Sequence, residues 1–150
     1  MKVFEIMSID VGFVRLDEDL SKAAAIMWEK DCGVVPIVTD ELVVVGIVTD
    51  RDIAIASASR NRPPSAIRAC EMIADPPIVC GMEDSVADVL KTMSRLGIRR
   101  LPVAGERREL FGMISIADIL SKGRKKDFKR ALKTLIKLAG RGCGAECIEI

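Results

Sequence analysis

An internal repeat constrains this 150-residue chain more than any other feature. The segments "GIVTDRD" (residues 46–52) and "GMISIAD" (residues 112–118) both read Gly, two apolar residues, a hydroxyl residue, two variable residues and Asp. An offset of 66 positions carries the first segment onto the second, and the same offset carries Met27 onto Met93. Because self-similarity at a fixed offset indicates a repeated supersecondary unit, we expect two copies of one unit.

Each copy contains the same predicted order of elements, β-α-β-β-α. Apolar residues at helical spacing predict the first helix of each copy, and a short polar turn between two apolar runs predicts a hairpin. In the first copy the strands are expected at 12–15, 34–39 and 42–48, and the helices at 20–30 and from Asp50. In the second copy the strands are expected at 78–81, 100–104 and 109–114, and the helices at 86–96 and from Ile116.

The domain organisation follows from the size of the repeat. A unit of about 60 residues buries little apolar surface alone, so we expect residues 1–122 to form one integrated module. Its parts are a first repeat at 1–58, a linker at 59–77 and a second repeat at 78–122. The linker prolines interrupt helix and leave room for one short helix. Residues 123–150 then supply a basic helix and a Cys/Gly tail.

This pattern resembles a tandem pair of CBS domains (cystathionine β-synthase domains), the arrangement called a Bateman module, in free-standing form. The resemblance runs from Met7 to Lys122 and is carried by the two heptads and by the strands "VPIV" and "RRLPV". It implies an α/β (α+β) fold of two pseudo-symmetric repeats packed face to face, followed here by a C-terminal amphipathic helix. It also implies a non-catalytic regulatory homodimer that binds AMP, ADP or ATP, with S-adenosylmethionine or NAD ranked below these.

The hydroxyl and Asp of each heptad have two interpretations. Thr49-x-x-Asp52 and Ser115-x-x-Asp118 both fit a helix capping box, which needs no ligand. Asp is one methylene shorter than the Glu or Gln that this box prefers, so we expect it to reach the N-cap amide poorly. The alternative is a ligand site, because a helix N-terminus after a strand attracts phosphate through its free amides and dipole.

The resemblance distributes the ligand contacts among specific residues. It implies ribose binding by Asp52 and Asp118, and phosphate binding by Thr49 and Ser115. Arg99 and Arg100 would lean toward the phosphates at the Thr49/Asp52 pocket and favour an anionic nucleotide there, although a solvated strand start is the alternative. Ile47 and Met113, each two positions before the hydroxyl, would wall the adenine of their own sites. The Ser115/Asp118 pocket would face Gly12, Cys32, Gly33 and Val34 and lack matching cations, and Ile78 completes the predicted adenine-pocket residues.

Positive charge is concentrated late in the chain. Residues 1–121 hold 14 Lys and Arg against 19 Asp and Glu, whereas residues 122–141 hold nine basic residues and one Asp. An amphipathic helix is predicted from Arg124 to Gly140, with the apolar stripe Phe128, Leu132, Leu135, Ile136 and Ala139. We interpret it as packing on the module or its dimer mate with a solvated basic face. Nucleic acid, acidic lipid or an acidic protein are alternative partners, and only charge supports nucleic acid.

Several classes of function are disfavoured. The chain has no His, so a cysteine nucleophile lacks that base, and Cys143 with Cys147 supplies too few ligands for zinc. Their role stays open between an ordinary thiol and a disulfide. No phosphate-binding glycine loop, secretory h-region or membrane-length apolar run is present. We therefore expect a cytoplasmic, non-enzymatic protein with an unidentified protein target, and we expect Trp28 to serve packing.

Overall fold

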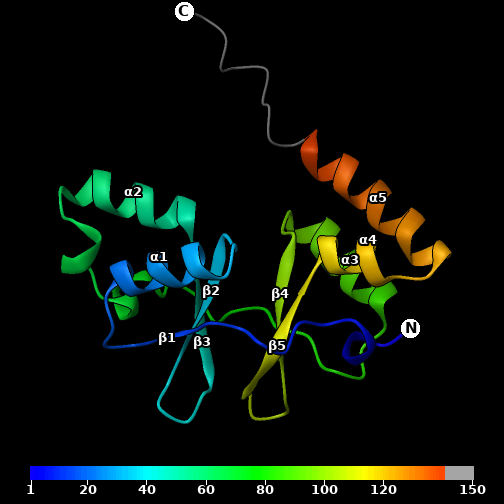
Figure 1. Ribbon diagram of the computed structural model, residues 1–150, viewed down its shortest axis with the longest axis horizontal. Helices are drawn as coiled ribbons and strands as arrows, with labels where there is room; N and C mark the ends of the chain where they lie inside the picture. The colour runs from blue at the N-terminus through cyan, green and yellow to red at the C-terminus, as the bar shows by residue number, and fades with distance from the viewer. Residues whose placement is uncertain (141–150) are drawn as a thin grey trace, which may run out of the picture. The chain divides into compact units, whose positions relative to one another are not determined.

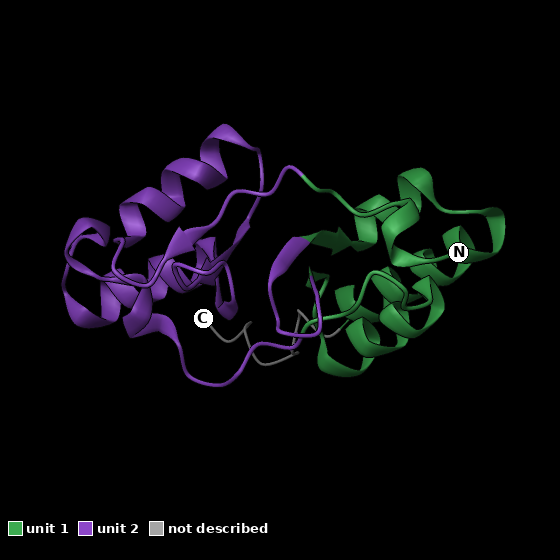
Figure 2. Ribbon diagram, turned by 90° about the horizontal axis from the view of Figure 1, so that it is seen from below, with its two compact units in different colours: residues 1–9, 79–103, 112–150 green, residues 10–78, 104–111 purple. Residues whose placement is uncertain are grey.

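The computed structural model describes residues 1–140 and contains α-helices, short 3₁₀ turns and two small sheets (Figure 1). The contacts divide the chain into two compact units (Figure 2). Unit 1 contains residues 1–9, 79–103 and the chain from Gly112 onward, and unit 2 contains residues 10–78 and 104–111. The mixed α/β fold confirms the predicted fold class, and the C-terminal helix is present; the full β-α-β-β-α order occurs in the first copy, whereas the second reads α-β-β-α. Packing of the repeats face to face stays a prediction.

Unit 2 holds a three-stranded sheet in the order β1-β2-β3, with β1 parallel to β2 and β2 antiparallel to β3. Its elements are β1 (Val14–Arg15), α1 (Leu20–Glu29), β2 (Val34–Val38), β3 (Val44–Thr49) and α2 (Asp50–Arg60). Asp19 caps α1 by accepting the amides of Ser21 and Lys22. The apolar face of α1 then buries Leu20, Ala23 and Met27 in the core.

Unit 1 repeats this arrangement around a two-stranded sheet. Its elements are α3 (Val86–Leu96), β4 (Arg100–Ala104), β5 (Leu110–Ser115), α4 (Ile116–Lys122) and α5 (Lys125–Ala139). Ser85 caps the start of α3, and Gly97 ends it in the left-handed conformation. The tip of the β4–β5 hairpin, residues 104–111, groups with unit 2, where Val44 N donates to Arg108 O at 2.9 Å.

The repeat extends further toward the N-terminus than the sequence predicted. The 3₁₀ turn η1 (Val3–Glu5) lies in unit 1, and the turn η3 (Ala69–Met72) lies 66 residues later in unit 2. Both turns close in the same way, because Glu5 accepts the Lys2 amide at 2.5 Å and Glu71 accepts the Arg68 amide at 2.9 Å. Each unit therefore takes its strands and helices from one repeat and its entry turn from the other.

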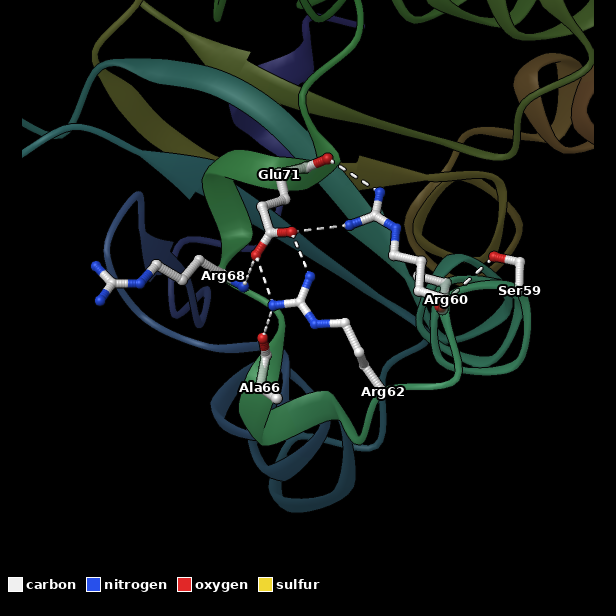
Figure 3. Close-up of polar contacts among 7 residues, drawn as sticks. Ser59, Arg60, Arg62, Ala66, Arg68 and Glu71 are labelled. Atoms are coloured by element: carbon white, nitrogen blue, oxygen red, sulfur yellow. Dashed lines mark hydrogen bonds and ion pairs between the residues drawn. The ribbon is translucent and has the colours of Figure 1, made fainter.

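The linker contains two 3₁₀ turns, η2 (Pro64–Ala66) and η3, where the sequence predicted one short helix. Glu71 holds this segment together (Figure 3): it accepts from the guanidinium groups of Arg60 at 3.1 Å and Arg62 at 2.8 Å. Arg62 also donates to the carbonyl of Ala66. The hydrogen bond from Arg62, followed by that from the Arg68 amide, lowers the pKa of Glu71.

Two further local predictions were wrong. The strand expected at 78–81 is reduced to one parallel bridge between Cys80 and Val103, since Pro76 and Pro77 before it have no amide to donate to a ladder. The indole of Trp28 does not pack in the core of the described chain but is 86% exposed. It directly follows Met27, and that single position turns it away from the buried face of α1.

Helix α5 packs with a different face from the one that the sequence indicated. The residues it buries are Asp127, Ala131, Thr134 and Leu138. From the predicted stripe only Leu135 packs partly against the core, while Phe128, Leu132 and Ile136 are 42%, 42% and 65% exposed. Helix α5 contacts both α3 and α4, and small side chains such as Ala131 permit that close approach.

Candidate functional site

Both heptads form the same strand-to-helix junction. Thr49 is the last residue of β3 and the N-cap of α2, and Ser115 is the last residue of β5 and the N-cap of α4. The two apolar residues before each hydroxyl continue the strand, and the Asp three residues later lies in the first helical turn. The pattern thus places a hydroxyl, a carboxylate and free helix amides at one end of a strand in each unit.

Each junction is closed by a complete capping box. The Asp52 amide donates to Thr49 Oγ1 at 3.1 Å, and the carboxylate oxygen Asp52 Oδ2 accepts the Thr49 amide at 2.9 Å and its hydroxyl at 2.7 Å. Ser115 and Asp118 repeat these bonds, with the Ser115 amide 2.9 Å from Asp118 Oδ2. The expectation that Asp is too short to reach back was wrong, because the extended backbone of the N-cap residue brings its amide within reach.

The glycine that opens each heptad is required by a close approach of the chain. A Cβ on Gly112 would lie 2.4 Å from the carbonyl oxygen of Ser8, which pairs with Met113 across this position. A Cβ on Gly46 would lie 3.0 Å from a side-chain carbon of Ile73. Met7, beside Gly112, and Ile73, beside Gly46, are related by the 66-residue offset. We call residues 3–8 and 69–74, which contain η1 and η3, the two entry segments. The glycine of each heptad therefore allows contact with an entry segment.

The two carboxylates differ in their remaining oxygen. Asp118 Oδ1 accepts hydrogen bonds from Ser8 Oγ and Lys122 Nζ, each at 3.2 Å. Asp52 Oδ1 has no hydrogen-bond partner among residues 1–140. Both residues are half-buried, so the difference lies in their neighbours and not in their burial.

Three of the predicted adenine-pocket residues lie next to Thr49 in unit 2. Val34 is the direct partner of Thr49 in the β2–β3 ladder, and Ile47 lies two positions before it on β3. The Gly33 carbonyl accepts the Asp50 amide at 3.4 Å. The structure thus places Gly33 and Val34, which the sequence assigned to the Ser115/Asp118 pocket, beside Thr49 together with Ile47, and their contact with adenine stays a prediction.

The other predicted pocket residues are placed differently. Gly12 precedes β1 and approaches α1, where a Cβ would lie 2.2 Å from a methyl carbon of Ile26. Ile78 is 44% exposed at the end of unit 2. Met113 is 8% exposed in unit 1, paired with Ser8. No described hydrogen bond joins these three residues to Thr49 or Asp52, and their contact with adenine stays a prediction.

Arg99 and Arg100 are exposed residues of unit 1. The Arg99 carbonyl accepts the Ile116 amide at 3.0 Å, which places its backbone beside the Ser115 junction. Thr49 and Asp52 belong to unit 2. A role for the two guanidinium groups at the Thr49/Asp52 pocket therefore stays a prediction.

Sequence reasoning missed Ser8 and Lys122, the two additional partners of Asp118. One signal was available for each of them. Lys122 follows Asp118 by four positions, which places both side chains on one face of a helix. Ser8 belongs to the entry segment, and the offset that relates Glu5 to Glu71 would have assigned this segment to the repeat.

Two observations bear on other kinds of site. Within residues 1–140, no group of three His, Cys, Asp or Glu side chains is arranged to hold a metal ion. Cys143 and Cys147 lie outside the described residues. None of the helices in the described part of the chain has both the length and the apolar character needed to span a bilayer.

Comparison with known proteins identifies the repeat. A family model of the CBS domain matches residues 3–59 and 69–125. Hypoxic response protein 1 of Mycobacterium tuberculosis is 35% identical over 115 residues, covering 77% of this chain and 80% of that protein. Its crystal structure, described as holding two coordinated zinc ions, has a TM-score of 0.74 and covers 81% of this chain and 98% of that chain at 31% identity.

Two other solved structures are similar. The CBS domain pair of protein MJ0100, in complex with 5′-methylthioadenosine and S-adenosyl-L-methionine, has a TM-score of 0.71 at 26% identity and covers 81% of this chain and 94% of that chain. A hexameric CBS-CP12 protein from bloom-forming cyanobacteria has a TM-score of 0.69 at 27% identity and covers 98% of this chain and 90% of that chain. With two matched segments that span most of its length, the chain belongs to the CBS domain family and carries a tandem pair of CBS domains.

Proposed function

We propose that this protein is a non-catalytic regulatory module that binds an adenosine-containing ligand, with AMP, ADP or ATP as the preferred class. The observation that carries the proposal is the Thr49/Asp52 junction, where the carboxylate oxygen Asp52 Oδ1, which has no partner within residues 1–140, lies beside the start of an 11-residue helix. The MJ0100 pair, similar in fold, is described in complex with two adenosine compounds.

The chemistry of the junction suits a nucleotide. An ionised carboxylate only accepts hydrogen bonds, so Asp52 Oδ1 can accept from a ribose hydroxyl while Oδ2 keeps the capping box. The free amides and positive dipole end of α2 favour phosphate at the same place. Both features attract parts of a nucleotide that adenine alone lacks, so we expect nucleotides to bind more tightly than free adenine.

Titration calorimetry with AMP, ATP, S-adenosylmethionine and 5′-methylthioadenosine tests this proposal. Asp52→Ala should weaken binding by about ten- to hundredfold, the value of a lost charged hydrogen bond. Asp88→Ala is the matched control, because Ser85 and Asp88 also place a hydroxyl three residues before an acid at a helix start, without the preceding glycine strand. Absence of binding by all four compounds, or equal losses in both variants, would contradict the proposal.

The regulatory part of the proposal concerns how binding is transmitted. A ligand that binds one packing of the two repeats more tightly than another shifts the population toward it, and a protein partner reads that change. In this view residues 1–122 act as one module, and the protein works as a homodimer in the cytoplasm. Light scattering at micromolar concentration checks the dimer, since a mass near one 16.3 kDa chain would exclude it.

A groove between α3 and α5 favours a second candidate function, that of an adaptor for an acidic protein segment. The groove has a volume of about 680 Å³, and its floor includes the apolar Ala87 and Leu90. No acidic side chain of the described residues lines it, whereas its rim carries the cations Lys91, Arg95, Arg130, Lys133 and Lys137. An apolar floor with a basic rim suits an acidic amphipathic helix better than the uniform charge of a nucleic acid backbone.

The adaptor function is tested with a designed helical peptide that carries Leu at positions i, i+3, i+4 and i+7 and Glu elsewhere. Its fluorescence anisotropy should rise with the full-length protein and fall with added salt. The double variant Lys133→Glu, Lys137→Glu should lose the peptide, while Lys126→Glu outside the groove should keep it. Tighter binding of a single-stranded or duplex oligonucleotide than of the peptide would favour a nucleic-acid regulator instead.

A further inference from the structure

We infer that the two adenosine sites are not equivalent: the Thr49/Asp52 junction is open, and Ser8 and Lys122 close the Ser115/Asp118 junction. The inference rests on the proposed function and specifies which site the ligand occupies. Ser8 and Lys122 thereby become the specificity-determining residues of the second site.

The closure follows from the hydrogen bonds of one carboxylate. Asp118 Oδ2 accepts the amide and hydroxyl of Ser115, and Asp118 Oδ1 accepts Ser8 Oγ and Lys122 Nζ, both at 3.2 Å. A ribose hydroxyl therefore has to displace a hydroxyl donor, a charged ammonium donor or both. At Asp52 the same ribose meets an oxygen with no partner among residues 1–140.

The amino-acid sequence explains why Asp118 has two extra hydrogen-bond donors and Asp52 has none among the described residues. The 66-residue offset relates Ser8 to Ala74 and Lys122 to Ala56. Neither alanine has a side-chain donor, so these two positions cannot supply the hydrogen bonds that Ser8 and Lys122 make at Asp118. The two junctions otherwise share the heptad, the capping box and an entry segment beside the glycine.

Both donors are held in place by other contacts. The Ser8 amide donates to the Met113 carbonyl, and the Met113 amide donates to the Ser8 carbonyl, each at 2.9 Å. Lys122 Nζ also donates to the Ile6 carbonyl at 3.1 Å, so it joins Asp118 to the entry segment. The Asp118 side chain is left 17% exposed. Both donors are in place before a ligand binds. A ligand at Asp118 therefore has to break hydrogen bonds that have no equivalent at Asp52 within the described part of the chain.

The cost is expressed as a difference in affinity between the sites. Each hydrogen bond to a charged group corresponds to about ten- to hundredfold in a binding constant. We expect at least about a tenfold weaker site at Asp118, because only one of its two extra bonds must break for a single ribose hydroxyl to enter. At ligand concentrations between the two dissociation constants, the first site is then mostly occupied and the second mostly empty.

Titration calorimetry of the full chain with AMP and with S-adenosylmethionine measures this stoichiometry. The unmodified protein should bind one ligand per chain, Asp52→Ala should weaken that event by about ten- to hundredfold, and Asp118→Ala should leave it unchanged. The double variant Ser8→Ala, Lys122→Met should bind a second ligand with affinity raised about tenfold or more, the methionine preserving most of the lysine stem's volume. A circular dichroism melt of each variant shows that it is folded.

The reciprocal graft tests the same closure from the other side. Ala74→Ser should weaken the first site, because it supplies a hydroxyl donor at the exposed position equivalent to Ser8, whereas Ala56 is buried in the core and is left unchanged. Two equal sites in the unmodified protein, or loss of its single site by Asp118→Ala and not by Asp52→Ala, would overturn the inference while leaving the proposed function standing. Failure of both compounds to bind every folded variant would overturn the proposed function and this inference together.

Discussion

The two heptad glycines offer a direct test of how the entry segments pack. Gly46→Ala and Gly112→Ala are the same substitution at equivalent positions of the repeat, in two β-strands of equal length. Any account based on strand propensity alone predicts equal effects. The structure predicts unequal effects, because the added methyl group meets a side chain in one unit and a backbone carbonyl in the other.

The magnitudes follow from those contacts. At Gly112 the new Cβ would lie 2.4 Å from Ser8 O, so the backbone must move and strain the two 2.9 Å bonds between Ser8 and Met113. Overpacking costs about 1–3 kcal/mol and each weakened hydrogen bond about 0.5–1.5 kcal/mol, so we expect a loss of about 2–4 kcal/mol in the free energy of unfolding. At Gly46 the neighbours at 3.0 and 3.2 Å are isoleucine side-chain carbons that can shift, and we expect about 1 kcal/mol or less.

Urea denaturation of both variants and the unmodified protein measures the difference. Both substitutions reduce the freedom of the unfolded chain and gain about 0.4–1 kcal/mol from it, so this contribution cancels between them. The difference of about 1–3 kcal/mol should place the thermal melt of Gly112→Ala about 2–12 °C below that of Gly46→Ala, given about 2–4 °C per kcal/mol for a chain of this size. Equal losses, or a larger loss at Gly46, would refute the crossing of Gly112 by the Ser8 backbone.

Three further predictions concern titration, reactivity and helix packing. The pKa of Glu71 is lowered, so its ion pairs stabilise the protein fully above the unfolded pKa of about 4.5, and this stability is lost as the pH falls through the lower folded value. Glu71→Gln should therefore lower the melting temperature more at pH 7 than at pH 3, and equal shifts at both pH values would contradict this. Burial raises the pKa of the Cys80 thiol to about 12, so iodoacetamide at pH 8 should alkylate the exposed Cys70 in the folded protein and leave Cys80 unmodified, as peptide mass spectrometry can show. In α5, Ala131→Asp should cost about 3 kcal/mol or more in urea denaturation because the position is fully buried, whereas Leu132→Asp should cost less than about 1 kcal/mol, and the reverse order would assign the buried face to the predicted stripe.

Most of the fold could be predicted from the sequence, because the same pattern of apolar and turn residues occurs in both repeats. Helix α3 and strand β4 have the bounds expected from apolar spacing and from the Ser85 cap and Gly97 stop. The buried face of α5 was not predictable in the same way. Helix α5 packs closely against α3 and α4, which requires small side chains such as Ala131 on the buried face. The most apolar stripe of the helix sequence does not show which face meets this requirement.

For the candidate site, the pattern located the hydroxyl and carboxylate but misjudged the geometry between them. The side-chain length of Asp52 suggested a poor cap, and the N-cap backbone conformation, which the sequence does not display, made it a good one. Ser8 was missed for a different reason. It reaches Asp118 from 110 positions away in the chain, and only a three-dimensional arrangement brings the two side chains together.

The placement of the first nine residues also has a consequence for how the chain is made. These residues leave the ribosome before their partners Met82, Asp84 and Met113, which are synthesised 78 to 105 residues later. The first repeat can form its own core during synthesis, while the N-terminal turn must wait for the last β-strand. Attachment of a slowly folding fusion partner to the N-terminus should therefore delay completion of unit 1 specifically, since closure of so long a loop is the slow kind of contact.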